Sequence, residues 1–287
     1  MKLPTFLVCL LLVQPRPSVL QENHTEFDYC SINCDGHKHT MCEYPEGGQP
    51  ACANFTRKLN PGMIAVLLEV HNELRQQVAM GKSENRQPQA ANMLLMSWSE
   101  EAARIAQRWV DQCTEGTRQD VCRNLKSGER GAQNFMVTSE QKEFDLYHFQ
   151  KEAVLRWFKT GKYLDQKNLH SYKSDPKSDH YARIVWALSD KIGCGFSKGV
   201  LNGSEVYRLA CNYYPAPVEG DPVYLVGRPC SKCPYARCSE YMPALCAPKI
   251  DSVHNRGNSG AESVKGGLWT VWIFGVLVLI KIIRVNA

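Results

Sequence analysis

Three stretches of the chain place apolar residues at the three- and four-residue spacing of an amphipathic helix. The first should begin at Asn60-Pro61, because Asn is a favoured N-cap and Pro a favoured first residue, and should end at Gly81. The second should begin after Ser99, and the third should run from about Glu143 to Thr160. The predicted apolar faces are Ile64, Leu67, Leu68, His71, Leu74 and Val78 in the first helix, and Ala102, Ile105, Ala106, Trp109 and Cys113 in the second.

Beyond residue 178 the period changes to the alternation typical of a strand. His180–Leu188 alternates, with Ala182 and Ile184 on its apolar side. Two further predicted strands, Gly193–Phe196 and Val206–Tyr214, flank an Asn-Gly pair that is a strong hairpin signal. Helices followed mostly by strands predict an α+β domain with an antiparallel sheet.

The overall composition is that of an ordinary globular protein, with 44% hydrophobic and 22% charged residues among 287. This length leaves room for one large domain plus appendages. The formal net charge is +5, from 34 basic and 29 acidic residues spread along the chain, so we expect no nucleic-acid partner. The unusual feature is the number of cysteines, which is 13.

The N-terminus carries the pattern of a secretory signal peptide. One positive charge precedes the apolar stretch Leu3–Val13, which is too short to span a bilayer. We assign residues 1–20 to this peptide, with cleavage within Ser18–Glu22. Its removal takes Cys9 and leaves an even number of cysteines, which in a secreted chain predicts disulfides rather than free thiols or a zinc site. Three glycosylation sequons, at Asn23, Asn54 and Asn202, fit the same compartment.

The C-terminal region combines a linker with a short apolar segment. Residues 251–267 are rich in Gly, Ser and Asn and predict a flexible linker. Residues 268–283 form a hydrophobic anchor segment that contains one charge, Lys281. The segment could span a bilayer if Lys281 reaches the interface. It could instead be a lipid-anchor signal with attachment at Ser259–Ala261, or a tail helix that packs on the protein.

Seven short motifs occupy the middle of the chain: His71–Arg75 (HNELR), Met96–Trp98 (MSW), Ala106–Trp109 (AQRW), Gly131–Asn134 (GAQN), Asp179–Trp186 (DHYARIVW), Gly193–Gly195 (GCG) and Cys211–Tyr213 (CNY). In this order and spacing they resemble the superfamily of cysteine-rich secretory proteins, antigen 5 and pathogenesis-related protein 1 (CAP), over roughly residues 57–222. The preceding cysteine-rich leader, residues 21–56, resembles that of arthropod venom allergens (antigen 5). The resemblance implies a three-layer α-β-α sandwich, which agrees with the order of elements above.

The resemblance also implies a disulfide pairing. Carried onto this chain, it joins Cys30–Cys42, Cys34–Cys122, Cys52–Cys113 and Cys194–Cys211. A small cysteine-rich hinge, residues 223–250, follows the main domain and contains Cys230, Cys233, Cys238 and Cys246. In a secreted chain these four predict two disulfides rather than a zinc site, with the pairing left open.

The resembling proteins often place two histidines and two acidic residues around a central cleft, and some of them bind a divalent metal there. This chain retains only His180, with Gln119, Gln133 and Thr160 at or near the other three positions. One imidazole with neutral neighbours cannot supply a zinc shell, so we predict no metal and no cofactor. The alternative ligands are Asp120, His148 and His170.

No arrangement of residues in the sequence predicts an enzyme. We find no His-Glu-x-x-His motif and no nucleophile with a recognisable base and orienting partner, and we expect His71 to be a buried structural histidine. The resulting prediction is a non-enzymatic extracellular antigen 5-like protein, of venom, salivary or allergen type, that binds a protein or a small lipid. The alternatives are a sterol or fatty-acid carrier, a toxin that modulates ion channels, and a membrane-tethered protein of the cell surface.

Overall fold

The computed structural model describes residues 27–49, 55–57, 59–83, 87–113, 119–140, 145–201 and 204–247. The predicted signal peptide, the three sequon asparagines, the linker and the anchor segment lie outside these ranges. Within them, no helix has the length and apolar character needed to cross a bilayer.

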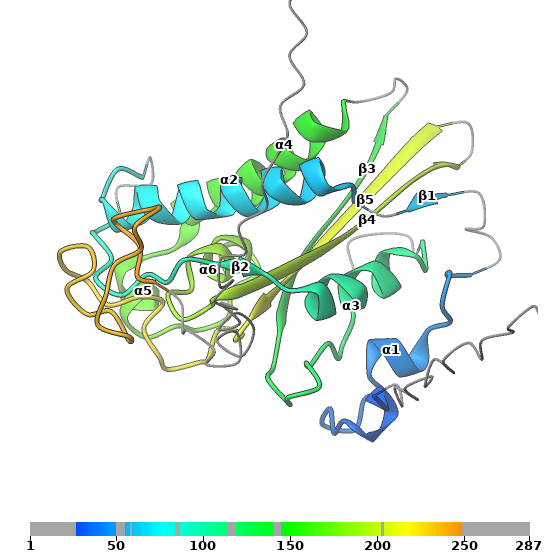
Figure 1. Cartoon of the computed structure of the whole chain (residues 1–287), viewed down its shortest axis with the longest axis horizontal. Helices are drawn as coiled ribbons and strands as arrows, with labels where there is room; N and C mark the ends of the chain where they lie inside the picture. The colour runs from blue at the N-terminus through cyan, green and yellow to red at the C-terminus, as the bar shows by residue number, and fades with distance from the viewer. Residues whose placement is uncertain are drawn as a thin grey trace, which may run out of the picture. The chain divides into compact units, whose positions relative to one another are not determined.

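A five-stranded sheet forms the middle layer of the molecule (Figure 1). Its long strands are β3 (Ala132–Glu140), β4 (Lys191–Leu201) and β5 (Ser204–Tyr214), which pair antiparallel in the order β4-β5-β3. Two short strands pair with the outer edge of β4, β1 (Thr56–Arg57) antiparallel and β2 (Ser97–Trp98) parallel. The predicted hairpin is confirmed, because β4 and β5 pair along their whole length.

Helices cover both faces of this sheet. Helices α2 (Pro61–Ala79), α4 (Leu146–Lys159) and α6 (Asp179–Val185) share the larger apolar core with one face of the sheet. Helix α3 (Glu100–Val110) packs on the opposite face (Figure 1). The three-layer α-β-α sandwich is therefore confirmed.

The helix boundaries follow local capping. Asn60 accepts a hydrogen bond from the Met63 N–H (2.9 Å) and Ser99 accepts one from the Ala102 N–H (3.2 Å), as the sequence predicts for α2 and α3. Helix α4 begins later than predicted, because Asp145 is its N-cap. Beyond the predicted end of this helix, the chain continues as the 3-10 turn η3 (Thr160–Tyr163). This turn leads to the short helix α5 (Gln166–His170).

One predicted strand is a helix. Residues 180–188 alternate in the sequence as a strand would, but α6 occupies most of them, and Leu188 beyond it is 44% exposed. The same apolar residues also fit a helix, because Tyr181 and Val185 lie four positions apart and are both fully buried. Thr160 favours the helix by accepting a hydrogen bond from the Tyr181 N–H (3.1 Å), one of the donors that a helix start leaves without a partner.

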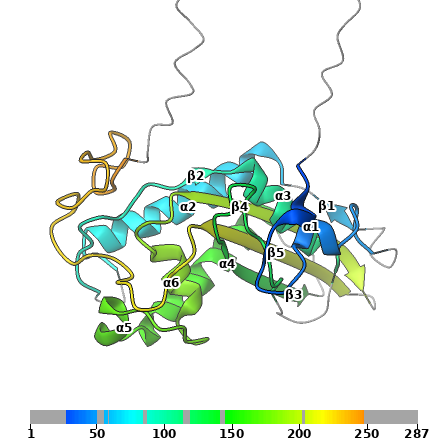
Figure 2. The same ribbon diagram turned by 90° about the horizontal axis from the view of Figure 1, so that it is seen from below.

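The cysteine-rich leader forms η1 (Tyr29–Ser31) and α1 (Thr40–Glu43), and α1 packs beside α3 (Figure 2). The Tyr29 hydroxyl donates to the Glu101 carboxylate at the start of α3 (2.8 Å). Cys52 of the implied pair Cys52–Cys113 lies outside the described residues. The structure bonds Cys30 to Cys42, Cys34 to Cys122 and Cys194 to Cys211, which are pairs that the resemblance implies.

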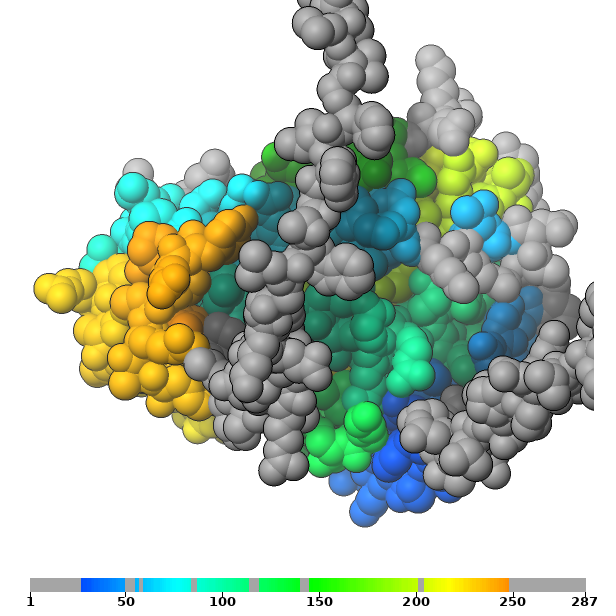
Figure 3. All heavy atoms as spheres, in the orientation of Figure 1, coloured from blue at the N-terminus to red at the C-terminus, as the bar shows by residue number. Residues whose placement is uncertain are grey.

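The predicted hinge packs back onto the main core as far as Ala247, where the described chain ends (Figure 3). Leu245 is fully buried in that core, and the backbone of Cys246 bonds to Met93 and Leu95 (2.7 and 2.8 Å). These bonds attach the hinge to the strand-like segment between α2 and β2.

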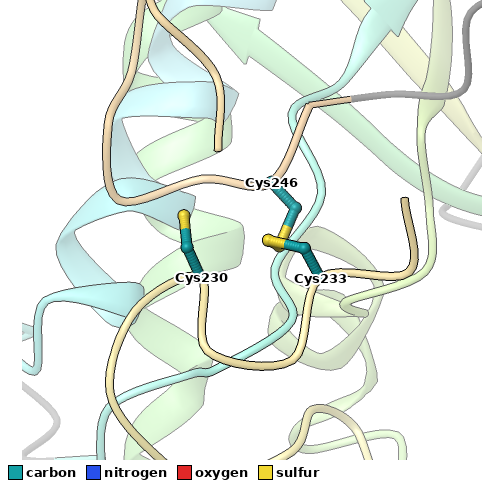
Figure 4. A group of neighbouring side chains, drawn as sticks. All are labelled: Cys230, Cys233 and Cys246. Atoms are coloured by element: carbon teal, nitrogen blue, oxygen red, sulfur yellow. A yellow bond between two sulfur atoms is a disulfide. The ribbon is translucent and has the colours of Figure 1, made fainter. Parts of the chain in front are cut away.

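The hinge cysteines differ from the expectation of two disulfides. Cys233 is bonded to Cys246, whereas Cys230 and Cys238 are free thiols (Figure 4). The Cys230 Sγ lies 3.4 Å from the carbonyl oxygens of Pro243 and Leu245, which act as its acceptors. Burial and a hydrogen bond with Cys238 raise the pKa of Cys230 to about 12, so its thiol stays protonated at neutral pH.

Arg75 of α2 organises the chain around the cleft. Its side chain is fully buried, and burial lowers its pKa to about 9, which still leaves the guanidinium charged at neutral pH. All of its described hydrogen bonds go to backbone carbonyls, so one side chain joins α2 to the end of α6 and to the segment before β2. The acceptors are the oxygens of Leu94, Ile184, Trp186, Ala187 and Ser189.

Candidate functional site

His180, the residue retained in the predicted cleft, is the second residue of α6. Its ring stacks over Trp157 of α4, with the centroids 6.3 Å apart and the planes inclined by 20°. Burial lowers the pKa of His180 to about 4, and the neighbouring Arg183 cation acts in the same direction, while Asp179 opposes it. The imidazole is therefore neutral at physiological pH.

Thr160 lies beside the start of α6, as the resemblance implies for a cleft residue. Its hydroxyl donates to the Trp157 carbonyl (2.7 Å) and accepts from the Tyr181 N–H (3.1 Å). Both hydrogen bonds of the hydroxyl connect α4 and α6, so Thr160 stabilises the packing of these two helices.

Gln133 and Gln119 are not brought together with His180. The Gln133 amide donates to Asn212 (2.9 Å), and Asn212 in turn donates to the Ala102 carbonyl of α3 (3.4 Å), which places both side chains on the α3 face of the sheet. Gln119 precedes Asp120, whose buried carboxylate accepts from Thr40 and pairs with Arg123. This second group of residues holds the leader against the loop after α3.

Arg183 and Asp179 lie on α6 with His180, in the region where the resemblance places the cleft. The Arg183 guanidinium donates to the Gln133 carbonyl (2.9 Å) and pairs with Asp179 (3.3 Å). The Asp179 carboxylate also accepts from the Tyr172 hydroxyl (2.9 Å) and the Ser174 hydroxyl (2.7 Å). Asp179, the residue before His180, is therefore already bonded to several donors.

A buried chain of hydrogen bonds extends from this cleft to α2. The short contact between His71 Nδ1 and the Leu67 carbonyl (2.6 Å) requires a proton on Nδ1. His71 Nε2 is then the acceptor for the Tyr213 hydroxyl (2.9 Å), which itself accepts from Asn134 (3.2 Å). Asn134 completes the chain by donating to the His180 carbonyl (2.9 Å). His71 is thus a buried structural histidine, as expected.

The fold and these motifs together correspond to one family. A model described as "Cysteine-rich secretory protein family" (CAP) matches residues 68–213, which include His180, Arg183 and most of the sheet. The chain belongs to this family.

Relatives with known names agree with the match. Venom allergen 3 from Solenopsis invicta is 37% identical over 217 residues, which are 69% of this chain and 88% of the relative. Venom allergen 5 from Polistes dominula is 32% identical over 228 residues, 76% of this chain and 96% of the relative. A crystal structure of NaASP2 with Zn2+ shares the fold, with a TM-score of 0.53, 24% identity and coverage of 66% of this chain and 96% of that one.

The cleft of this CAP protein does not fit a divalent cation. A zinc site needs several nitrogen, sulfur or carboxylate ligands around one point. Here the His180 ring stacks with Trp157, the nearby Arg183 cation helps to lower the pKa of His180, and Asp179 is held by its own donors. In the described ranges, the one cluster of three candidate ligands is Cys230, Cys233 and Cys246 of the hinge, and two of these sulfurs share a disulfide (Figure 4).

The alternative ligands proposed from the sequence lie elsewhere. Asp120 belongs to the leader contacts described above. His148 is exposed on α4 beside Glu69 and Glu73 of α2, in a shallow groove of about 380 Å³. His170 is exposed at the end of α5. None of the three is among the residues described around His180.

Sequence reasoning overlooked one catalytic spacing. Gly195–Gly199 reads Gly-x-Ser-x-Gly, the pattern of a nucleophile elbow, which requires an exposed serine on a sharp turn between a strand and a helix. Ser197 instead lies within β4, is fully buried, and bonds through its hydroxyl to the Val110 carbonyl (3.2 Å). The motif is therefore a structural part of the sheet.

A second feature that sequence reasoning missed is a groove beside β4. It has a volume of about 260 Å³ and lies where the start of α2 and helix α3 approach the edge of the sheet. Its lining is mainly apolar, with three polar side chains. The lining residues are Leu59, Ile64, Trp98, Ala103 and Cys194, with Glu100, Arg104 and Gln107.

Proposed function

We propose that the chain is a non-enzymatic extracellular binding protein of the CAP family. The observation that carries the proposal is that Asp179, the carboxylate next to His180 in the chain, is bonded to the Tyr172 and Ser174 hydroxyls and paired with Arg183, so its acceptors are already used by other donors. A neutral imidazole without an orienting carboxylate cannot act as an activated base for a nucleophile. The cleft is thus a rigid polar centre of the fold.

Binding is supported by the way the surface is held in place. Disulfides attach the leader to the loop after α3 and join β4 to β5, while the hinge packs on the core. A surface that is already ordered loses little conformational entropy when a partner binds. The relatives named venom allergens and the predicted signal peptide support an extracellular location.

The proposal is tested by measuring turnover and zinc binding in the purified, oxidised chain. Peptidase and esterase substrates are assayed with wild type, His180→Ala and, as a matched control, His148→Ala, which removes an exposed histidine. We expect no turnover that depends on His180 and no sub-micromolar binding of zinc. Turnover or zinc binding that is lost in His180→Ala and kept in His148→Ala contradicts the proposal.

A small lipid is the second candidate ligand, and the apolar lining of the groove beside β4 favours it. The volume of about 260 Å³ lies slightly below the range of about 300 to 1,000 Å³ that is usual for small-molecule pockets. Saturable uptake of radiolabelled palmitate or sterol by the wild type would support this function, and its absence would reject it.

We also propose that residues 268–283 tether the protein to the cell surface, on the basis of their sequence alone. The test expresses the full chain in cells and compares release by phospholipase with extraction by detergent. Release by phospholipase identifies a lipid anchor, and extraction by detergent alone identifies a spanning segment. Free protein in the medium contradicts the tether.

A further inference from the structure

The hinge contains two free thiols in a chain whose other described cysteines all form disulfides. Cys230 and Cys238 are free, whereas the remaining described cysteines of the leader, the main domain and the hinge are each bonded to a partner. The two thiols are also hydrogen-bonded to each other. An extracellular chain meets the disulfides of other molecules, so a pair of free thiols is a chemically reactive feature there.

Cys238 is an exposed thiol on an ordered backbone. It forms an antiparallel bridge with Cys246, and the next residue, Ser239, donates its N–H to the Leu245 carbonyl (2.8 Å). Cys246 and Leu245 are both fully buried, so this bridge attaches Cys238 to the core. A partner can therefore reach a thiol whose position is fixed by the fold.

Cys230 is the more enclosed thiol of the pair. It is partly buried, and its Sγ lies 3.4 Å from the carbonyl oxygens of Pro243 and Leu245. Burial and the hydrogen bond with Cys238 raise the pKa of Cys230 to about 12. Because the thiolate is the nucleophile of a cysteine, Cys230 is poorly placed to attack a disulfide that arrives from outside. It is well placed to react with whatever is bonded to Cys238.

We propose that Cys238 and Cys230 form a thiol pair that reacts with an exposed disulfide of a partner. The Cys238 thiol loses its proton to solvent and attacks one sulfur of that disulfide. A bond forms between Cys238 and the partner, and the second partner sulfur leaves as a thiolate that takes up a proton. Cys230 then loses its proton and attacks the Cys238 sulfur, which closes a Cys230–Cys238 disulfide and releases the first partner sulfur. The partner disulfide is reduced to two thiols while the hinge pair is oxidised.

This reaction goes beyond the binding function proposed above, because it joins the partner to the chain through a covalent bond. Each chain reacts once, so the reaction is stoichiometric and differs from enzymatic turnover. The first step captures the partner, and the second step releases it and leaves the hinge with two disulfides.

A competing reaction lies within the hinge itself. The sulfurs of Cys230, Cys233 and Cys246 lie within 4.8 Å of one another, and Cys233 is bonded to Cys246 (Figure 4). Attack by Cys230 on that disulfide would exchange one hinge pairing for another without any partner. The exposure of Cys238 and the enclosure of Cys230 favour the reaction with a partner instead. The pairing found after reaction distinguishes the two routes.

The charges of the hinge favour an acidic partner. Its exposed charged residues in the described part are three bases, Arg228, Lys232 and Arg237, and one acid, Glu240. Arg237 directly precedes Cys238 in the chain. Opposite charges increase the rate of encounter, and added salt reduces this effect. We therefore expect disulfides that carry acidic groups to react.

The test uses the full chain and glutathione disulfide, which is small and acidic, as the partner. Cys230→Ser removes the second step, so one glutathione should remain bonded to Cys238, as located by mass spectrometry after alkylation. The wild type should instead form the Cys230–Cys238 disulfide and release both halves of the probe as thiols. Cys238→Ser should react at least about tenfold more slowly, because Cys230 is enclosed and protonated. Ser231→Ala, at an exposed hinge position, is the control and should react as the wild type does.

Several results overturn the inference. They are the absence of an adduct in Cys230→Ser, capture of glutathione at the same rate in Cys238→Ser, a wild type that keeps both thiols, and a disulfide between Cys230 and either Cys233 or Cys246. A rate of capture that does not fall with added salt contradicts the acidic partner. If Cys230→Ser does not fold, Cys230→Ala replaces it. None of these results affects the His180 tests, so failure here and failure of the proposed function are distinguishable.

Discussion

The cleft around His180 and the groove beside Cys194 lie on the same domain but differ in how their polar groups are satisfied. In the cleft, Asp179 and Arg183 bond to each other and to several neighbours, and the hydroxyl of Thr160 both donates and accepts. In the groove, the lining is mainly apolar, and the Gln107 amide bonds to both backbone groups of the buried Phe196.

This difference indicates where a partner could bind. A ligand that bonded to Asp179, Arg183 or Thr160 would have to replace hydrogen bonds that the fold already makes, and the net gain is small. The groove instead offers a mainly apolar lining. The polar centre around His180 is thus a structural element, and the groove beside β4 is the better candidate for recognition.

The largest expected effect on stability comes from replacing Arg75, which joins the segments around His180. Arg75→Met removes the donor for five buried carbonyls, including those of Leu94 and Trp186. We expect the free energy of unfolding to fall by about 3 to 5 kcal/mol, because several buried carbonyls lose their hydrogen-bond donor at once. Urea denaturation measures this. The control Arg156→Met removes an exposed arginine and should cost less than about 0.5 kcal/mol. Similar losses in both variants would show that the cleft side has no special rigidity.

The next largest effect is the pH dependence of stability. The pKa of His71 and that of His180 fall from 6.5 to about 4 on folding, so between these pH values the unfolded chain binds more protons. Stability is therefore full above pH 6.5 and decreases as the pH falls toward 4. The loss is up to about 3 kcal/mol for the fully buried His71, and less for the partly exposed His180.

Urea denaturation at pH 7.5, 5.5 and 4.5 checks this dependence. His71→Gln removes the larger contribution and should flatten the pH profile. His148→Gln, which removes an exposed histidine, should leave the profile as steep as in the wild type. An equally steep profile in His71→Gln would mean that the buried imidazole does not carry the effect.

A smaller effect is expected at Tyr213, which connects His71 to the cleft. Tyr213→Phe leaves the His71 Nε2 without a donor and Asn134 without one acceptor, inside the fully buried core. We expect a loss of about 2 kcal/mol by thermal or urea denaturation. Tyr163→Phe is the control, because Tyr163 is 53% exposed. A loss at Tyr213 no larger than at Tyr163 would break the chain of hydrogen bonds proposed here.

Much of the fold was predictable because it depends on local signals. The caps at Asn60 and Ser99, the apolar periods of α2, α3 and α4, and the Asn-Gly hairpin signal each act over a few residues, and these predicted correct elements. α6 was predicted as a strand because its short apolar pattern fits both periods. The contact that favours the helix comes from Thr160, twenty-one residues away from Tyr181.

The sites were less predictable from the sequence, because tertiary packing brings their residues together. The retained imidazole of His180 was visible in the sequence, but its cationic neighbour Arg183 depends on the helical spacing of α6. The glycines of the Gly193–Gly195 motif were also visible in the sequence, but the sequence does not show why glycine is needed there. A Cβ on Gly193 would lie 2.2 Å from the Ala103 nitrogen, so the motif allows α3 to pack closely against β4 beside the groove. No local pattern predicts that groove.

The smallest expected effect on stability comes from replacing Gln107, which lines the groove. Gln107→Leu removes the amide that bonds to both backbone groups of Phe196 at the outer side of β4. We expect a loss of about 1 kcal/mol, the usual net contribution of a hydrogen bond. Gln77→Leu, at an exposed position of α2, is the control. Hydrogen exchange gives the decisive measurement, since the Phe196 amide should lose protection in Gln107→Leu alone. Unchanged protection would mean that another part of the chain covers this edge.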